Sequence, residues 1–434
     1  MLQVISATWA LMFGLLLLMV GNGVQGTLLG IRGGIESFTT YQMSVVMSAY
    51  FLGFLGGSRL APEMIRRVGH IRVFAALGSL VSAILILYPT FPNPVAWSIG
   101  RVLMGFCLSG VYVTTESWLN NAVTNERRGQ ALSLYMIVQM AGIMAAQGLL
   151  LLGDPAGYLL FVIPSVLVSV SFAPILLAVS PTPAFEATKL MSLRRLWRTS
   201  PLGCVGTFLL GGVYSATFGM ASVFGTEAGL GVAQISAFVF TIYLGGMLMQ
   251  YPIGWLSDRM DRRWLILVVA LVGALASVGA FVFAQRFEAL LIAAFLIGGS
   301  SNPLYALVLA YVNDHLKSED MAAASGGLIF INGIGAIAGP LITGWMMEMA
   351  GPQGFFLYLF ILCATLTAYA GWRMTRSGAV PVEDTASYAP VLPTATPVAV
   401  AAAHEVFSDP VVESGTARET HDRGRQETAP DAGD

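Results

Sequence analysis

Twelve runs of mostly apolar residues, each about twenty residues long, follow one another along the chain and limit what it can fold into. A helix needs about 20 apolar residues to cross the hydrocarbon core of a bilayer. Runs of this length are too long for ordinary strands. They lie near 5–30, 41–61, 72–90, 95–119, 130–152 and 157–179, and then near 203–225, 233–253, 264–284, 288–311, 321–347 and 353–373. They predict an all-α membrane protein with twelve transmembrane helices.

The composition agrees with lipid as the main solvent. Charged residues make up 11% of the 434 residues and hydrophobic residues 56%, whereas soluble domains carry about 25% charged residues. The net charge of −2 indicates no nucleic-acid partner. The three cysteines and four histidines are not spaced as ligands or disulfide partners are, so we expect no metal and no cofactor.

The first run, Leu2 to Gly30, differs from a signal peptide. No basic residue precedes it, since Arg32 is the first charged residue of the chain. It is also longer than the usual apolar core of about 7–15 residues. We expect it to be retained as the first transmembrane helix.

Lysine and arginine residues are distributed unevenly between alternate loops. With the N-terminus inside, sixteen of them lie in cytoplasmic segments and only Arg32 and Arg286 lie on the opposite side. Basic residues are retained on the cytoplasmic side of a membrane. We therefore expect a multi-pass protein of a bacterial inner (plasma) membrane with both termini in the cytoplasm.

The interruption after the sixth run divides the chain into four predicted units. These are a six-helix bundle over 1–179, a cytoplasmic linker over 180–200, a second bundle over 201–376 and a tail over 377–434. The linker ends in a basic amphipathic stretch over 193–198, which is typical either of a helix on an anionic membrane surface or of a solvated connector. The tail has few large apolar residues to bury, so it is expected to be disordered.

The two halves resemble each other at one constant offset. The matched residues are Trp118 to Asn121 with Tyr311 to Asp314, Glu126 with Glu319, Ala131 with Ala324 and Gly142 with Gly335. A shared apolar composition does not explain matched polar residues in loops, so we infer a duplication. The duplication predicts two pseudo-symmetric six-helix bundles with a solute site between them, near the membrane midplane.

The run over 233–253 is followed by the sequence GWLSDRMDRR, from Gly254 to Arg263. This stretch resembles the Gly-x-Leu-x-Asp-Arg-x-Gly-Arg-Arg loop of the major facilitator superfamily (MFS). The resemblance implies the MFS fold and a cytoplasmic gate. In that gate Asp258 would lie at the positive N-terminal end of the helix over 321–347, and arginines would bridge to acids such as Asp314. The alternative is that these arginines only set the topology.

The corresponding stretch after the second run departs from the family pattern. Ala61 stands at the position of the acid, and Glu63 is displaced from it by two residues. The resemblance extends over 1–376 and, with the stretch 116–121, indicates a poorly characterised bacterial branch of the superfamily. The residues assigned to the gate in the two loops and near them are Gly57, Arg66, Arg67, Gly254, Asp258, Arg259, Arg262, Arg263 and Asp314.

Two ionisable residues fall within the run over 95–119. Arg101, followed by Gly105, resembles a family motif whose arginine is linked to proton coupling. An arginine at this depth costs about 2.5–3.5 kcal/mol unless it faces a polar cavity. Arg101 therefore either lines the pathway, binding a solute carboxylate or tuning a proton site, or extends to the outer interface. Glu116 is expected to pair with Arg66 or Arg67 as part of the gate, with proton carriage as the alternative.

Uncharged polar residues within the runs complete the predicted pathway. Each is explained equally by a hydrogen bond between helices. They are Asn22, Gln25, Gln139, Tyr214, Asn302, Tyr305 and Asn332.

These features favour a secondary active transporter that moves a small neutral or anionic solute by alternating access, with proton coupling as a hypothesis. ATP use is disfavoured because no phosphate-binding loop is present, and the runs carry no His, Cys or Ser constellation of an enzyme. The expected partners are the solute, protons and the lipid bilayer, and the chain is expected to be a monomer. Two alternatives are a multidrug efflux carrier and a non-transporting membrane sensor or scaffold.

Overall fold

The computed structural model describes residues 2–177, 191–316, 318–376, 378, 380–381, 385, 388–396 and 399–400, and these residues contain helices and no strand. The first half contains α1 (Leu2–Ile35), α2 (Thr40–Val68), α3 (His70–Thr90), α4 (Pro94–Ala122), α5 (Asn125–Leu149) with the short turn η1 (Leu150–Leu152), and α6 (Leu159–Leu177). The second half contains α7 (Leu193–Thr199), α8 (Pro201–Ser215), η2 (Ala216–Met220), α9 (Ala221–Glu227), α10 (Val232–Ser257), α11 (Arg262–Val282), α12 (Phe287–Asn313), α13 (Ser318–Ala350) and α14 (Gly354–Met374).

The predicted transmembrane runs are found as helices. Among the described residues, eleven helical segments are long and apolar enough to cross a membrane, and Leu159–Pro174 is a shorter apolar helix at the sixth predicted position. The run predicted over 203–225 is not one regular α-helix, because the π-helical segment η2 joins α8 to α9. Such a segment contains one extra residue per turn and is often found at functional sites.

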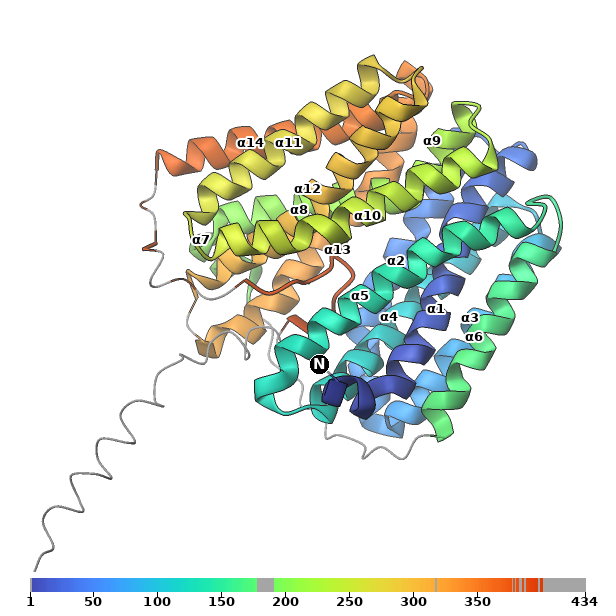
Figure 1. The fold of residues 1–434 in the computed structure, drawn as a ribbon, viewed down its shortest axis with the longest axis horizontal. Helices are drawn as coiled ribbons and strands as arrows, with labels where there is room; N and C mark the ends of the chain where they lie inside the picture. The colour runs from blue at the N-terminus through green and yellow to red at the C-terminus, as the bar shows by residue number, and fades with distance from the viewer. Residues whose placement is uncertain are drawn as a thin grey trace, which may run out of the picture.

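The helices form two bundles with the same internal packing (Figure 1). In the first bundle α2 lies along α4, α1 packs on α5 and α6, and α3 packs on α6; in the second, α10 lies along α12, α8 packs on α13 and α14, and α11 packs on α14. The starts of α4 and α12 lie 193 positions apart, and so do the starts of α5 and α13. The structure thus confirms the two pseudo-symmetric bundles that the repeat predicts.

Glycines allow the closest helix pair in each bundle to touch backbone to backbone. A Cβ atom on Gly53 of α2 would collide with the carbonyl of Val102 on α4, and one on Gly105 of α4 would collide with the carbonyl of Tyr50. In the second bundle, Gly298 of α12 lies 193 residues after Gly105, and a Cβ atom on it would collide in the same way with the carbonyl of Ile242 on α10. Small residues commonly provide such contacts between helices in lipid, because the hydrophobic effect does not drive helices together there and close packing must do so.

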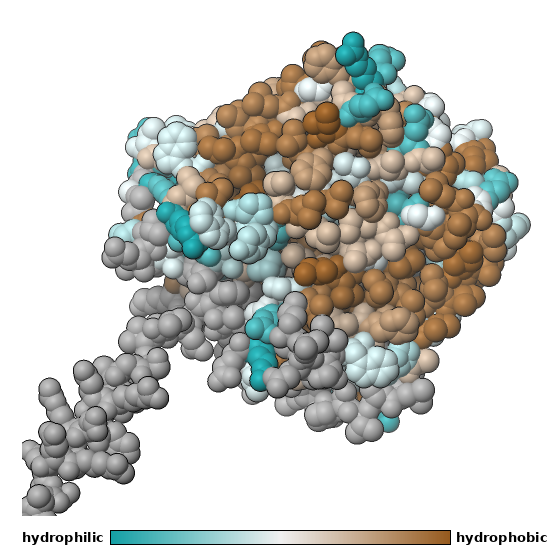
Figure 2. All heavy atoms as spheres, in the orientation of Figure 1, coloured by the Kyte–Doolittle hydropathy of each residue, from teal (hydrophilic) through white to brown (hydrophobic). Residues whose placement is uncertain are grey.

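The outer surface is apolar along the helices. Figure 2 shows broad brown areas over the bundles, with hydrophilic residues gathered mainly toward the margins. The large exposed side chains of α3, α6 and α11 include Leu80, Leu87, Val162, Val166, Leu271 and Leu275. An exposed apolar belt of this size is explained by lipid contact, since soluble monomers expose patches of only a few hundred Å².

The linker helix α7 lies against the second bundle. Leu196 is fully buried, Trp197 is half-exposed, and Arg195 forms an exposed ion pair of 2.7 Å with Asp320 of α13. The basic stretch over 193–198 is therefore helical and packs one residue into the protein. The preceding residues 178–190 of the predicted linker lie outside the described residues.

The two bundles meet mainly at one end of the molecule. We call the end where α1 begins the terminal face and the opposite end, with the turns at 36–39 and 228–231, the loop face. Near the loop face the backbone N–H of Tyr41 donates to Glu348 (3.1 Å), and the Thr226 hydroxyl donates to the carbonyl of Gly30 (3.4 Å). Figure 1 shows the bundles diverging from this end toward the terminal face.

Candidate functional site

A small cavity of about 20 Å³ lies between the bundles. Four of the predicted pathway residues line it together: Asn22 from α1, Gln139 from α5, Tyr214 from α8 and Asn302 from α12. The first two belong to one bundle and the last two to the other. The structure therefore brings together in one site four residues that lie far apart in the sequence.

A second cavity, also of about 20 Å³, adjoins the first through Tyr214. It contains the predicted residue Asn332 of α13. Gln25 and Tyr305 are not on the walls of these cavities. Both are almost fully buried in helix packing, and the Tyr305 hydroxyl and both amide atoms of Gln25 have no hydrogen-bond partner among the described residues.

Arg101 is fully buried inside the first bundle. Its Nη2 atom lies 3.5 Å from the sulfur of Met47, and its guanidinium carbon lies 4.6 Å from the centre of the Tyr50 ring. Nε and Nη1 have no partner, and no carboxylate of the described residues lies within ion-pair distance. The position excludes a side chain that extends to the membrane interface. Arg101 lies directly behind Tyr50, which lines the second cavity.

Glu116 is buried on the same helix, fifteen residues closer to the terminal face, or about 22 Å at the helical rise. The Tyr135 hydroxyl donates to its Oε1 atom at 2.9 Å. The expected pairing with Arg66 or Arg67 is wrong. Both arginines instead form ion pairs with Glu63, which lies three and four residues earlier on α2, at 2.5 and 2.7 Å. These three residues are exposed, whereas Glu116 faces the interior.

Sequence reasoning missed the aromatic wall of the site. Tyr50, Tyr112 and Tyr243 line the cavities, and the ring of Tyr214 stacks on Phe218 of η2 with centroids 5.7 Å apart. Tyr50 lies 5.5 Å from Phe218 in turn, again between ring centroids. The π-helical segment thus places a ring from the second bundle against a tyrosine from the first.

The repeat carried a signal that could have found these tyrosines. At the offset of 193 residues, Tyr50 corresponds to Tyr243, Tyr112 to Tyr305 and Gln139 to Asn332. Five of these six residues line the cavities. Arg101 and Glu116 have no charged counterpart, since Ala294 and Leu309 occupy the related positions. The tyrosine and amide framework is therefore symmetric, and the buried charges belong to the first bundle alone.

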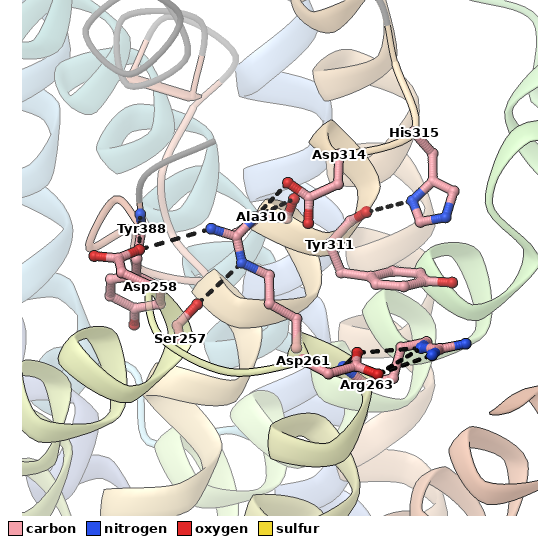
Figure 3. A network of polar contacts seen from close by, with 10 residues as sticks. Ser257, Asp258, Asp261, Arg263, Ala310, Tyr311, Asp314, His315 and Tyr388 are labelled. Atoms are coloured by element: carbon pink, nitrogen blue, oxygen red, sulfur yellow. Dashed lines mark hydrogen bonds and ion pairs between the residues drawn. The ribbon is translucent and has the colours of Figure 1, made fainter. Parts of the chain in front are cut away.

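The arginines after α10 form a network within the second bundle (Figure 3). Arg262 donates to Asp314 at the end of α12 and to the Ser257 hydroxyl at 3.1 Å, and it lies 3.7 Å from Asp258. The predicted contact with Asp314 is confirmed. All four residues belong to one bundle, however, so these contacts secure the α10–α11 turn to α12 and do not by themselves join the two bundles.

The other members of the predicted gate have local partners. Arg263 pairs with Asp261 at 2.8 Å, and Arg259 lies over the ring of Trp255 at 4.2 Å. Burial alone would raise the pKa of Asp261, but the hydrogen bonds and charge of Arg263 outweigh it and hold this pKa below its usual value. Asp261 therefore remains ionised near neutral pH. Gly57 packs against the backbone of Phe106 on α4.

The family resemblance implies a contact between Asp258 and the start of α13; among the described residues, Asp258 is instead seen to contact the C-terminal tail. Its Oδ1 atom accepts a hydrogen bond of 2.7 Å from the backbone N–H of Tyr388. The Tyr388 ring rests on Gly254, where a side chain would leave it no room. Both residues of the motif thus contact the C-terminal tail.

Residues 388–396 of the tail, for which composition predicts disorder, lie between the bundles with specific partners. Tyr388, Val391 and Ala395 are buried, and the Thr396 N–H donates to Glu116 at 3.2 Å. A few apolar side chains and several backbone hydrogen bonds give this stretch the contacts that its overall composition did not indicate. Residues 401–434 lie outside the described residues.

Two helical bundles that are related by an internal repeat, with amide and tyrosine side chains from both on the walls of cavities between them, define the architecture of a secondary transporter. The family model of the Major Facilitator Superfamily matches the chain twice, over residues 11–242 and 203–412. The chain therefore belongs to the Major Facilitator Superfamily and is a transporter, not an enzyme.

Relatives and solved structures agree with this assignment. An uncharacterized MFS-type transporter, YcaD, of Salmonella arizonae is 26% identical over 370 residues, covering 83% of this chain and 95% of its own length. The YcaD protein of Escherichia coli O6:K15:H31 is 28% identical over 366 residues, covering 82% and 92%. The fold is similar to the nucleoside transporter NupG (TM-score 0.72, 15% identity, 85% of this chain and 100% of that one) and to the E. coli fucose:proton symporter FucP (TM-score 0.56, 15% identity, 85% and 99%).

The network around Arg262 leads to a stability prediction. The side chains of Arg262 and Asp314 are each only 2% exposed. Removing one member of a buried pair leaves an uncompensated charge and costs up to about 3–5 kcal/mol. We expect Asp314→Asn to lower the thermal unfolding midpoint of the purified protein by several degrees. The control is Glu63→Gln, which breaks an exposed pair worth about 1 kcal/mol or less. Equal midpoints for the two variants would contradict the structural role of the Arg262 pair.

Proposed function

We propose that this transporter moves a small neutral or anionic solute by alternating access, through the cavity between the bundles. The observation that carries the proposal is the position of repeat-related residues from both bundles, Gln139 and Asn332 among them, on the walls of adjoining cavities at the bundle interface. A carrier of this architecture binds its solute where the two halves meet and moves the halves around it.

The chemistry of the walls supports a particular class of solute. Tyrosine rings offer flat apolar faces with a hydroxyl at the edge, and the amides of Asn22, Gln139, Asn302 and Asn332 offer both donors and acceptors. This combination suits a ring-shaped molecule with several hydroxyl or amide groups. NupG and FucP are described as carriers of a nucleoside and of fucose, which are both molecules of this kind.

The charge of Arg101 favours anionic members of that class. Its guanidinium lies behind Tyr50, and no carboxylate of the described residues compensates it. In a low-dielectric interior a charge acts on its neighbours more strongly than in water. Arg101 would therefore act through the Tyr50 wall as a positioning residue that raises the affinity for a carboxylate on the solute.

This role of Arg101 predicts a change in selectivity. A thermal-shift screen of the purified protein would use matched neutral and acidic probes, such as hexoses with uronic acids and nucleosides with their carboxylate derivatives. We expect Arg101→Gln to weaken binding of an acidic probe about tenfold or more, equal to about 1.4 kcal/mol, and to change the affinity for its neutral partner less than threefold. Arg101→Lys keeps the charge and should retain part of the preference. Equal losses for both probes would instead indicate a structural role, and preferred binding of hydrophobic cations would favour the efflux alternative.

The contacts between the bundles support a cycle in which the loop face opens. They gather near that face, and the bundles diverge toward the terminal face. The excess of basic residues in the loops of the terminal face supports placing this face in the cytoplasm. Release of the solute on the other side would require the loop-face contacts to separate.

A reversible cross-link tests whether this separation is required. A Cβ atom on Gly34 of α1 would lie 3.7 Å from the Cβ of Thr226 on α9, within the range for a disulfide. We expect the pair Gly34→Cys with Thr226→Cys to lose uptake of a radiolabelled probe into proteoliposomes on oxidation and to regain it on reduction. Thr226→Cys alone, which adds no atom beside Gly34, is the control and should be insensitive to the oxidant. Full uptake by the oxidised pair would rule out alternating access at this face, and a scaffold function would tolerate the lock.

Proton coupling is proposed through Glu116. It is a buried acid on the terminal-face side of the cavity, and its hydrogen-bond partners Tyr135 and Thr396 are neutral. We expect Glu116→Gln to abolish the response of uptake to an imposed pH gradient while leaving counterflow exchange of the probe intact, because exchange needs no net proton movement. Glu63→Gln, which removes an exposed acid, is the matched control. Gradient-driven uptake that persists in Glu116→Gln would exclude this carboxylate as the proton site.

A further inference from the structure

The segment 388–396, called here the tail segment, contacts both bundles inside the space that separates them. In the second bundle, the Tyr388 hydroxyl accepts from Gln250 (2.8 Å), and the Asn332 amide donates to the carbonyl of Pro393 (3.2 Å). In the first bundle, the N–H and the hydroxyl of Thr396 both donate to Glu116. The tail segment thus bridges two bodies that must move relative to each other in a transport cycle.

The tail segment also occupies the pathway itself. Leu392 and Thr394 form part of the wall of the central cavity, and Pro393 and Thr394 form part of the wall of its neighbour. A third cavity of about 20 Å³, between Gln139 and the terminal face, is lined on one side by Pro390 to Leu392. All three cavities are therefore the space that remains around the tail segment.

Two hydrogen-bond partners of the tail segment are residues expected to act on a solute or a proton, and a third belongs to the predicted gate. Asn332 belongs to the amide framework, Glu116 is the buried acid, and Asp258 belongs to the family motif. A solute that enters from the terminal face would meet the same groups. The tail segment and the solute consequently compete for them.

We propose that the tail segment is an autoinhibitory plug that binds in the solute pathway from the terminal face. With the plug in place the pathway is filled, and the bundles cannot approach each other at the terminal face because the segment lies between them. The competition with solute rests on the proposed function of the cavity, whereas the occupation of the cavity by the plug does not.

The length of the connection makes such a plug effective yet displaceable. Only thirteen residues separate Met374, the end of α14, from Tyr388. A short tether of this kind gives an effective concentration on the order of millimolar. A few hydrogen bonds and three buried apolar side chains therefore suffice to keep the site filled by the tethered segment. Release of the plug would raise the apparent affinity for solute in proportion to the fraction of open molecules.

A cysteine accessibility experiment tests the plug without knowledge of the solute. Ser58 of α2 is buried, lines the cavity beside Pro393 and Thr394, and becomes a near-isosteric probe as Ser58→Cys. The three native cysteines are buried, so the parent protein sets the background of labelling. The labelling rate with a small water-soluble maleimide would be measured in the full chain, in a chain ending at residue 387 and in a chain ending at residue 400.

We expect Ser58→Cys to react about tenfold faster or more in the chain ending at 387. The chain ending at 400 retains the tail segment and should react like the full chain. Thr375→Cys, which is exposed beyond α14, should react equally in all three and reports any general loosening. In the full chain, Thr396→Val removes the hydroxyl contact with Glu116 at nearly constant volume and should give an intermediate rate.

Equal rates for Ser58→Cys in the full chain and in the chain ending at 387 would overturn the plug. An increase that also appears at Thr375→Cys would overturn it as well, since it would indicate loss of the fold. The failure of every probe in the thermal-shift screen would count against the proposed solute class, but the labelling result would still decide whether the tail segment fills the cavity.

Discussion

The structure depends on the absence of water from the hydrocarbon core of a bilayer. Every backbone N–H and C=O group at that depth must be satisfied within the protein, and this requirement selects helices. Polar side chains face the same constraint, so Asn22, Gln139 and Asn302 point away from lipid toward one shared interior. The apolar outer belt and the interior position of these amides are two consequences of the same solvent.

Duplication explains how a chain of this kind obtains a central site. Each bundle is closely packed within itself, as at Gly53 and Gly105, and the bundles meet along surfaces that the repeat makes similar. Several tyrosines and amides related by the repeat therefore line the adjoining cavities at the interface. Arg101 and Glu116 break the symmetry, and a symmetric framework with charges on one side can distinguish the two ends of a bound solute.

The tail segment is a third structural element at this interface, in contact with both bundles. Its contacts with Asp258 and Gly254 connect it to the loop motif that the superfamily resemblance singles out. The arginine network around Arg262 holds that loop against α12. The residues that Tyr388 contacts, Gly254 and Asp258, are therefore fixed to the second bundle. Motif, network and tail therefore form one continuous set of contacts at the terminal face (Figure 3).

The sequence by itself determined the helices, their number and the two related bundles, because these follow from apolar run length and from an offset visible in the residues. It also indicated which polar residues lie within the helices. Only the tertiary structure decided that Asn22 and Asn302 share a cavity, that Arg101 lies behind Tyr50 and that Glu116 meets Thr396 and not Arg66. Those facts depend on the rotation of each helix about its axis and on contacts between residues far apart in the chain, which side-chain packing sets and local sequence does not encode.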